Sequence, residues 1–330
     1  MSILVTGSSG RVGSAVVSRL LKEGETVRGF DLRASGRAHP DFSEVTGALS
    51  DAQAVETAMA GVTHVLHLGA FMSWAPADRA RMFEANVEGT RVLLDAAAQA
   101  GATRFVFASS GEVYPENVPQ FLPVTEEHPL HANSPYGLTK LLGEELVRFH
   151  QRAGKMETVI LRFSHTQDAA ELLDETSFFS GPRFFLQPRI RQQEGFGNHA
   201  AADILRAADP GVPAHVVARN ENGRPFRMHI TDTRDMVEGV LLAMLSENAA
   251  GQVFNLGATE PVDLAGLVHA MAASTGLPVV EADLPGAGVW YHTSNDKIRR
   301  VLRFEPQWTI ERMLEEAVQA RRARLAKTGT

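Results

Sequence analysis

Cysteine is absent from this chain of 330 residues, which excludes disulfide bonds, thiol nucleophiles and thiolate metal sites together. No apolar run approaches the ~18–20 residues that a membrane-spanning helix needs, and no basic segment precedes the apolar stretch that begins at Ser2. No run of five like charges occurs, and the net charge is −7. Nothing in the composition therefore suggests a nucleic-acid or membrane partner, and we expect a cytoplasmic protein that acts on a small molecule.

The first half of the chain alternates short β-branched runs with helical patterns. We expect strands at Ile3–Thr6, Thr26–Phe30, Glu44–Gly47, His64–Leu68, Arg104–Ser109 and Thr158–Arg162. We expect helices at Val12–Lys22, Asp51–Ala60, Phe83–Ala100 and Pro135–Ala153, each followed by a glycine that can end it in the left-handed conformation. This alternation predicts an α/β fold with a parallel sheet covered on both faces.

The pattern breaks after Arg162. Residues 165–228 read as irregular, with one helix at Ala200–Ala208. Regular patterns then return, with a strand at Val253–Leu256 and helices at Asp232–Ser246, Leu264–Thr275, Asn295–Leu302 and Ile310–Leu325. We predict a nucleotide-binding domain over residues 1–164 and a smaller substrate-binding lobe over 165–330, separated by a cleft. Whether segments near 226–262 return to the first domain is left open.

A glycine-rich segment, Thr6-Gly7-Ser8-Ser9-Gly10-Arg11-Val12-Gly13, joins the first expected strand to the first helix. Glycines there permit a tight turn and let the backbone approach a pyrophosphate, which would lie against the free N–H groups of the helix start. Asp31 follows at the distance, about 20 residues, at which a carboxylate binds the adenosine ribose and repels a 2′-phosphate. Arg33 could instead pair with that phosphate. We favour NAD over NADP.

A tyrosine and a lysine four residues apart suggest acid–base chemistry. Tyr136 and Lys140 share one face of a helix whose start is marked by Asn133 or Ser134 as N-cap and by Pro135. A tyrosine titrates near pH 10, and a neighbouring ammonium lowers that pKa. The pair could then take a hydroxyl proton while hydride leaves the same carbon for a nicotinamide. The alternative is an ordinary exposed helical pair.

Further motifs occur in a characteristic order. They are Leu68-Gly69-Ala70, Asn86-Val87-Glu88-Gly89-Thr90, Ser109-Ser110-Gly111-Glu112-Val113-Tyr114, Met228-His229-Ile230-Thr231-Asp232 and Phe254-Asn255-Leu256-Gly257. With the glycine segment and the Tyr–Lys pair, this set resembles the extended short-chain dehydrogenases/reductases, the NAD-dependent epimerase/dehydratase family. The resemblance spans nearly the whole chain and implies a Rossmann doubly wound parallel sheet with a smaller C-terminal substrate lobe.

The resemblance also assigns roles to residues. It implies that Ser110 hydrogen-bonds the reacting oxygen, Tyr136 is the general acid/base, Lys140 binds the nicotinamide ribose and Asn86 supports the site. The cofactor set that it implies is Gly7, Ser9, Gly10, Arg11, Val12, Gly13, Asp31, Leu49, Leu68, Gly69, Ala70, Ser109, Tyr136, Lys140 and Phe163. Ala48 stands where relatives usually carry an aspartate near the adenine.

The substrate end is less determined. Glu112 matches a glutamate that sugar dehydratases and decarboxylases use at C5, but it equally fits a site-lining or structural role. His165 could line the substrate pocket or simply pack. Arg227 is a candidate substrate contact, although the two positions at which relatives place diphosphate-binding arginines hold Pro225 and Leu284.

Two more sets of basic residues leave alternatives open. Arg183, Arg189 and Arg191 could form a different anion site or a solvated basic loop. The histidines show no i,i+4 pair on a helix, so we predict no metal site.

The leading hypothesis is an NAD-dependent epimerase or dehydratase that acts on a nucleotide-linked or free sugar through a transient ketone. The alternative is a dehydrogenase of a free sugar, sugar acid or other small carbinol that releases NADH. A third possibility is a catalytically silent NAD-sensing protein. The resemblance also implies a homodimer built on the helices near Phe83–Ala100 and Pro135–Ala153, which carry Val92, Leu93, Leu141, Leu142, Leu146 and Phe149.

Overall fold

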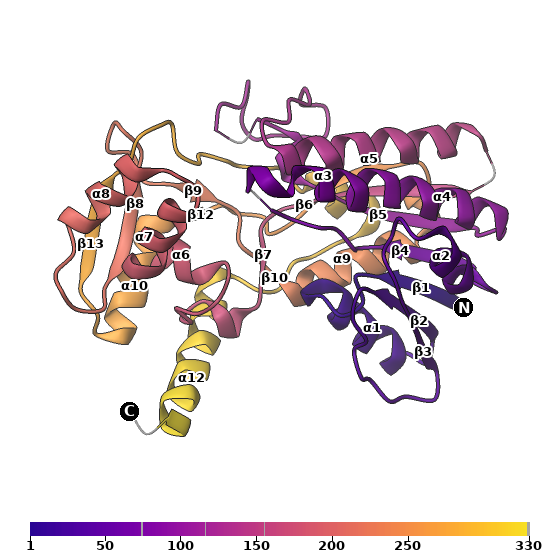
Figure 1. The fold of residues 1–330 in the computed structure, drawn as a ribbon, viewed down its shortest axis with the longest axis horizontal. Coiled ribbons are helices and arrows are strands. Elements are labelled where there is room, and N and C mark those ends of the chain that lie inside the picture. The colour runs from indigo at the N-terminus through magenta and orange to yellow at the C-terminus, as the bar shows by residue number, and fades with distance from the viewer. Residues whose placement is uncertain (74, 116, 155, 329–330) are drawn as a thin grey trace.

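The computed structural model describes residues 1–73, 75–115, 117–154 and 156–328. A seven-stranded parallel sheet lies at the centre of its larger part (Figure 1). Its strands are β1 (Ser2–Thr6), β2 (Thr26–Asp31), β3 (Phe42–Thr46), β4 (His64–His67), β5 (Arg104–Ser110), β6 (Glu157–Phe163) and β11 (Val253–Leu256). The order is β11-β6-β5-β4-β1-β2-β3. The direction of winding reverses between β1 and β4, which is where doubly wound folds bind ligands.

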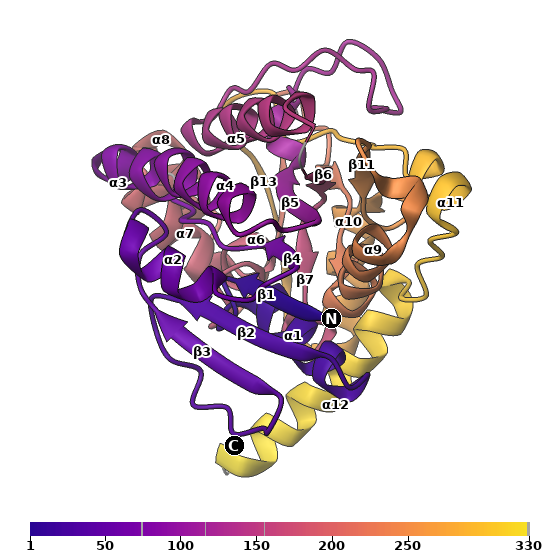
Figure 2. The same ribbon diagram turned by 90° about the vertical axis from the view of Figure 1, so that its right-hand side faces the viewer.

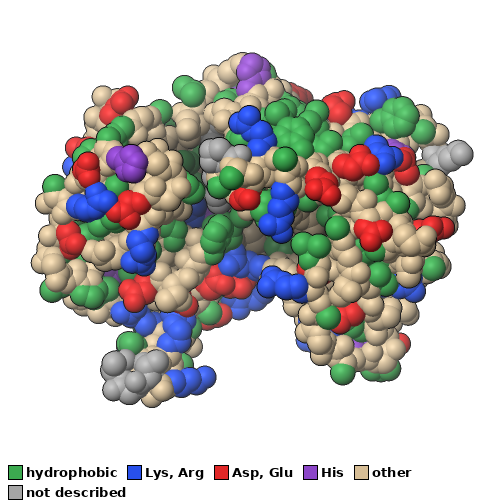
Figure 3. Space-filling model, in the orientation of Figure 1, with side chains coloured by type: hydrophobic (Ala, Val, Ile, Leu, Met, Phe, Trp, Pro, Cys, Tyr) green, Lys and Arg blue, Asp and Glu red, His purple; other side chains and the backbone are tan. Residues whose placement is uncertain are grey.

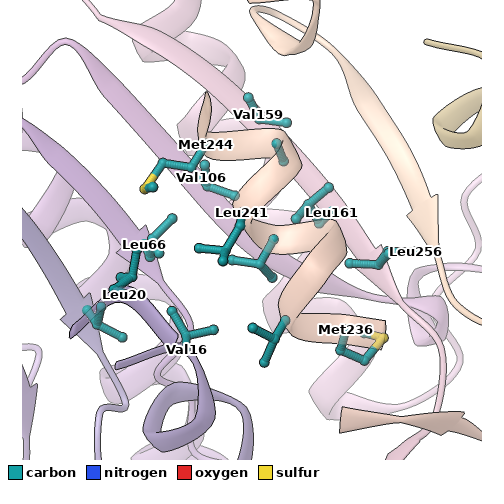
Figure 4. Packing of buried hydrophobic residues seen from close by; sticks show 14 of the residues in the cluster. Val16, Leu20, Leu66, Val106, Val159, Leu161, Met236, Leu241, Met244 and Leu256 are labelled. Atoms are coloured by element: carbon teal, nitrogen blue, oxygen red, sulfur yellow. The ribbon is translucent and has the colours of Figure 1, made fainter. Parts of the chain in front are cut away.

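Helices cover both faces of this sheet (Figure 2). The helices α1 (Arg11–Lys22), α9 (Thr233–Leu245) and α11 (Asp296–Leu302) cover one face, and α2 (Ala52–Met59), α4 (Gly89–Gln99) and α5 (Pro135–Arg152) cover the other. Successive strand residues point to opposite faces, so in β4 Leu66 packs beneath α9 while Val65 packs beneath α4. Figure 4 shows Leu241 of α9 lying against Leu161 and Val106 of the sheet. Burial of each such side chain contributes roughly 1.5–3 kcal/mol.

The second lobe has its own small sheet and two apolar clusters. It contains α6 (Ser180–Phe184), α7 (Leu186–Gly195), α8 (His199–Ala207), β8 (His215–Arg219), α10 (Leu264–Thr275) and β13 (Val279–Asp283), with α12 (Ile310–Thr328) packed against it. Strands β8 and β13 pair in parallel. Two short pairs run between the parts, β7 (Thr166–Gln167) with β10 (Thr231–Asp232) and β9 (Arg227–Met228) with β12 (Val262–Asp263).

The predicted doubly wound α/β fold is confirmed, and β11 shows that the chain returns to the large sheet after residue 226. The reading of residues 165–228 as irregular with one helix is wrong, because α6, α7 and β8 also lie there. Pro188 in the first turn of α7 and the fully buried pattern of β8 hide the usual periodicities. The helix expected at Phe83–Ala100 is interrupted by a π-helical turn at Glu84–Glu88 that follows α3 (Arg79–Phe83).

Candidate active site

The turn after β1 is shaped for close approach of a ligand to the backbone. Gly7 is left-handed, with φ +68°, and a Cβ on it would lie 2.7 Å from the Gly69 Cα. A Cβ on Gly13 would lie 2.0 Å from the Gly7 carbonyl oxygen, so neither position accepts a side chain without movement. Gly10 caps α1 without a side-chain hydrogen bond, which leaves the first N–H groups of a 12-residue helix open to an anion. These residues fit a dinucleotide pyrophosphate.

Asp31, at the end of β2, is held beside this turn. Its Oδ2 accepts a hydrogen bond from the Ser9 N–H at 3.1 Å, and its Oδ1 accepts one from the Arg33 N–H at 3.3 Å. The Ser9 hydroxyl donates to the Arg33 carbonyl at 2.8 Å. The carboxylate is thus fixed where a ribose diol can donate to it, and the Arg33 side chain is exposed.

One cavity of about 740 Å³ connects the turn with the candidate catalytic residues. Figure 3 shows this side of the molecule hollowed between its two parts, with acidic and basic side chains interspersed around the hollow. Most of the predicted site residues line the cavity, namely Gly7, Gly10, Arg11, Val12, Gly13, Asp31, Leu68, Gly69, Ala70, Ser109, Ser110, Glu112, Tyr136, Lys140, Phe163 and His165. Ser9, Leu49, Asn86 and Arg227 are not among its lining residues.

The Tyr–Lys pair is placed by a well-capped helix. The Ser134 hydroxyl accepts from the Gly137 N–H at 2.9 Å, and Pro135 occupies the first turn of α5. The Lys140 Nζ donates to the Ala108 carbonyl at 2.7 Å and lies 5.8 Å from the centre of the Tyr136 ring. Burial lowers the pKa of Lys140 to about 7.

The Tyr136 phenol is more basic than the sequence alone suggests. Burial raises its pKa above the ordinary value, and the nearby Glu112 carboxylate adds to the rise. The lowering expected from Lys140 is therefore outweighed in this arrangement. Tyr136 is therefore a neutral phenol before the reaction begins.

Glu112 and Ser110 lie together at the end of β5. The Ser110 Oγ accepts from the Glu112 N–H at 3.1 Å, and its own proton remains available to a substrate oxygen. The Glu112 carboxylate accepts from the Ser134 hydroxyl at 2.5 Å. Burial raises the pKa of Glu112, and the bond from Ser134 only partly opposes that rise. A carboxyl group that readily holds a proton therefore stands close to Tyr136.

Asn86 supports the site from outside the cavity. Its Oδ1 accepts from the Phe71 N–H at 2.7 Å, and its Nδ2 donates to the Phe71 carbonyl at 2.9 Å and to the Thr139 hydroxyl at 3.0 Å. It lies in the π-helical turn before α4, a type of turn that often marks functional sites. Asn86 thus ties the loop after β4 to the helix that carries Tyr136 and Lys140.

Two predicted cofactor residues lie differently from the rest of the set. Leu49 does not line the cavity but packs against the core cluster beneath α4, close enough that a Cβ on Gly89 would lie 2.5 Å from its own Cβ. Arg11 lines the cavity, yet its guanidinium is bound to the lobe segment, donating to Glu171 at 2.5 Å and to the Thr166 carbonyl at 3.2 Å. Arg11 therefore joins the start of α1 to the second lobe.

On the substrate side the structure separates residues that the sequence grouped together. His165, Arg183 and Arg189 line the cavity, whereas Arg191 lines a different one. An Arg183 NH1 lies 2.7 Å from the His165 Nε2. The prediction that Arg227 contacts substrate is not supported, because its guanidinium stacks on Trp290 at 5.6 Å instead.

Sequence reasoning missed a buried ionic network beneath the site. Glu144 bonds both the Ser109 hydroxyl at 2.7 Å and the Arg162 guanidinium at 2.8 Å, and Arg162 also donates to the Tyr114 hydroxyl. These bonds hold the ends of β5 and β6 against α5. The one available signal was Glu144 itself, four residues after Lys140 on the same helix face.

Comparison with known proteins decides the family. Residues 3–167 match the model of the NAD dependent epimerase/dehydratase family, which is half of the chain. The chain belongs to that family. It is accordingly an enzyme of a family whose cofactor is NAD, as the sequence predicted.

Three relatives place the chain within this family. A short-chain dehydrogenase/reductase superfamily protein from Agrobacterium tumefaciens, crystallised with NAD, is 70% identical over 100% of this chain and 99% of that one, with a TM-score of 0.97. A UDP-glucose 4-epimerase of Halalkalibacterium halodurans is 27% identical over 96% of this chain and 94% of its own. A 3-beta-hydroxysteroid dehydrogenase of Mycolicibacterium neoaurum is 38% identical, but over only 44% of this chain.

Some similarities cover only part of the relative. The matched stretch spans 42% of that steroid dehydrogenase and 39% of the protein y4nG of Sinorhizobium fredii.

Within the described ranges, no helix is long and apolar enough to cross a membrane. No group of three or more His, Asp or Glu side chains in that part of the chain is placed to hold a metal ion.

Proposed function

We propose that this enzyme removes hydride from a carbinol carbon of a sugar-like substrate and returns it after a transient ketone has formed, as epimerases and dehydratases do. The observation that carries the proposal is a single cavity that contains both the glycine turn and the trio Ser110, Tyr136 and Lys140. NAD, when bound, supplies the acceptor and donor of hydride. Gly7, Gly13 and the N-terminus of α1 would hold its pyrophosphate.

Tyr136 would exchange the proton with the substrate. Its raised pKa makes the neutral phenol the stable form in the cavity, which suits the donation of a proton to a ketone oxygen on the return step. The forward step needs the phenolate, so the resting phenol must first release its own proton to solvent, and Lys140 in its charged form favours that anion electrostatically. The phenolate then takes the hydroxyl proton of the substrate. Ser110 would fix the reacting oxygen by a hydrogen bond, so proton transfer occurs at one defined atom.

Glu112 has a supporting place in this scheme. Because burial favours its protonated form, a neutral Glu112 removes the charge that otherwise opposes a Tyr136 phenolate. Substitution by glutamine keeps the shape and the neutral state. An enzyme that needs Glu112 only as a neutral neighbour should tolerate Glu112→Gln, whereas one that uses it as an acid or base at the substrate should lose turnover.

Absorbance of the bound nicotinamide tests the proposal. An epimerase or dehydratase should convert substrate with its nucleotide retained and with no net rise in reduced nicotinamide. Stoichiometric NADH in solution would reject the hydride-return step.

That second outcome would identify a dehydrogenase, which one observation favours. The positions of the family's diphosphate arginines hold Pro225 and Leu284, and the neighbouring Arg224 and Arg227 both stack on Trp290, at 4.6 and 5.6 Å. A site without those arginines is suited to a small substrate that is not linked to a nucleotide.

We also propose a two-fold homodimer through α4 and α5. Phe149 is 61% exposed and Leu138 is 40% exposed on α5, while Leu142 is partly exposed. Val92 and Leu93, by contrast, are buried beneath α4 and contribute nothing to an outer face. The apolar surface that supports the dimer is therefore mainly on α5.

A further inference from the structure

The wall of the cavity that the second lobe supplies carries two arginines. Arg183 comes from α6 and Arg189 from α7, and both line the same cavity as Ser110 and Tyr136. An Arg189 NH1 donates to the carbonyl of Pro182, the residue before Arg183, at 3.2 Å. This bond ties Arg189 to the segment that carries Arg183, whose own guanidinium lies 2.7 Å from the His165 Nε2.

The Arg189 guanidinium has little to balance it. Its Nε is buried and has no hydrogen-bond partner among the described residues. The guanidinium also lies over the ring of Phe226, and the distance from its carbon to the ring centre is 5.8 Å. Burial lowers the pKa of Arg189 to about 10, and no acid among the described residues opposes that effect. The group still carries its positive charge at neutral pH.

The acids of the cavity are committed elsewhere. In the part of the chain that the structure describes, Asp31 and Glu112 are the acidic residues that line it. Asp31 accepts hydrogen bonds from Ser9 and Arg33 at the cofactor end, and Glu112 accepts one from Ser134. Because an unpaired buried cation is costly, a counter-charge supplied by a ligand would relieve a strain that no described residue relieves.

We propose that Arg189, with Arg183 beside it, binds a carboxylate carried by the substrate itself, so that the substrate is a sugar acid or another hydroxy acid. This inference rests on the proposed function, because it assumes that the substrate occupies the cavity at Tyr136. A guanidinium presents a planar fork of donors that matches a carboxylate. Arg189 therefore sets both the charge of the substrate and its orientation.

The neighbouring surface favours this small anion over the diphosphate of a nucleotide-linked sugar. The lobe residues that line the cavity with Arg189 are mostly apolar, among them Val216, Val217, Phe226 and Val268, with His229 and Tyr291 as polar members. The apolar side chains offer no hydrogen-bonding groups to a base or a ribose. A carboxylate needs only the arginines, whereas a nucleotide needs a polar surface beyond them.

Titration calorimetry on the protein saturated with NADH tests the proposal without turnover. The probes are D-glucuronate and D-galacturonate, each compared with its neutral counterpart, D-glucose or D-galactose. We expect at least one acid to bind at least about tenfold more tightly than its neutral sugar, which corresponds to about 1.4 kcal/mol. Arg189→Met should abolish that preference, and Arg189→Lys should retain part of it.

Arg191→Met is the matched control, because Arg191 lies on the same helix but lines a different cavity. It should keep the full preference. Arg189→Met should unfold at the same temperature as the parent or a higher one, since it removes an uncompensated buried cation. If Arg189→Met does not fold, Arg189→Lys serves as the test. An Arg189→Lys protein that keeps the parent's full preference for the acid would overturn the assignment of a bidentate site.

Two results would overturn the proposal: equal binding of acids and neutral sugars by the parent, or a preference that survives in Arg189→Met. Tight binding of UDP-glucose that depends on Arg189, without a preference for uronates, would assign the arginine to a diphosphate instead. Tyr136→Phe should leave the carboxylate preference intact. Failure of the Tyr136 mechanism would therefore show in turnover, and failure of the carboxylate site in binding.

Discussion

Replacing Lys140 with methionine should stabilise the protein stripped of nucleotide while impairing catalysis. Lys140 is 3% exposed, and burial lowers its pKa from 10.5 to about 7. At about 1.36 kcal/mol for each pH unit, this difference disfavours folding by roughly 5 kcal/mol when the amine is charged in both states. Methionine packs without a charge, and loss of the hydrogen bond to Ala108 costs only about 1 kcal/mol. We expect a net gain of roughly 2–4 kcal/mol.

The gain should depend on pH in a defined direction. Below about pH 7 Lys140 is charged in both the folded and the unfolded chain, so the full penalty applies. Between about pH 7 and 10.5 the folded chain has released the proton that the unfolded chain still holds. The stability of the parent therefore rises relative to the variant as the pH increases through this window.

Urea unfolding at about pH 6.5 and about pH 9.5 measures both effects. The gap between Lys140→Met and parent should be largest at the lower pH and nearly closed at the higher one. Lys22→Met, at an exposed site in the last turn of α1, is the control and should change stability by less than about 1 kcal/mol at both pH values. A Lys140→Met variant that is less stable than the parent, or a gap that does not shrink, would refute the reasoning.

Other predictions follow from single features of the site and the surface. Asp31→Ala should weaken binding of NAD more than that of NADP, as measured by calorimetry, and equal affinity of the parent for both would contradict the role of Asp31. Ser110→Ala should lower kcat by less than Tyr136→Phe does, because one hydrogen bond is lost while proton transfer survives; a larger loss would make Ser110 the essential group. Light scattering at micromolar concentration should show a dimer that Phe149→Asp converts to a monomer, and a monomeric parent would exclude the dimer.

Local sequence patterns were sufficient to predict the larger sheet and its helices. The glycine turn, Asp31 and the Tyr136–Lys140 spacing are short-range signals, so their arrangement follows once β1, β2 and α5 form. Strands β8 and β13 pair in parallel although they are separated by more than a helix. Neither strand shows alternation that would distinguish it from a loop, which explains why both strands were missed although α8, α10 and α12 lie where helices were expected.

The substrate side of the site depends on contacts that sequence spacing does not encode. Arg189 and Arg191 are two residues apart, yet they line different cavities, because neighbouring positions on α7 face different sides. Arg227 looked equally plausible by its place in the chain, but Trp290, far along the sequence, holds it elsewhere. Which arginine meets the substrate is therefore decided by tertiary packing.

The most direct test of the account is single-turnover hydride transfer by Tyr136→Phe, followed as the transient rise in absorbance of reduced nicotinamide before hydride returns, with the best substrate from a panel of sugars and sugar acids. Phenylalanine keeps the ring and its packing but removes the group that exchanges the proton. The rate should fall by roughly 10²–10⁴, while affinity for NAD and the unfolding temperature stay close to those of the parent. A variant that transfers hydride at nearly the parental rate would show that the proton takes another route, and the central role given to Tyr136 would be wrong.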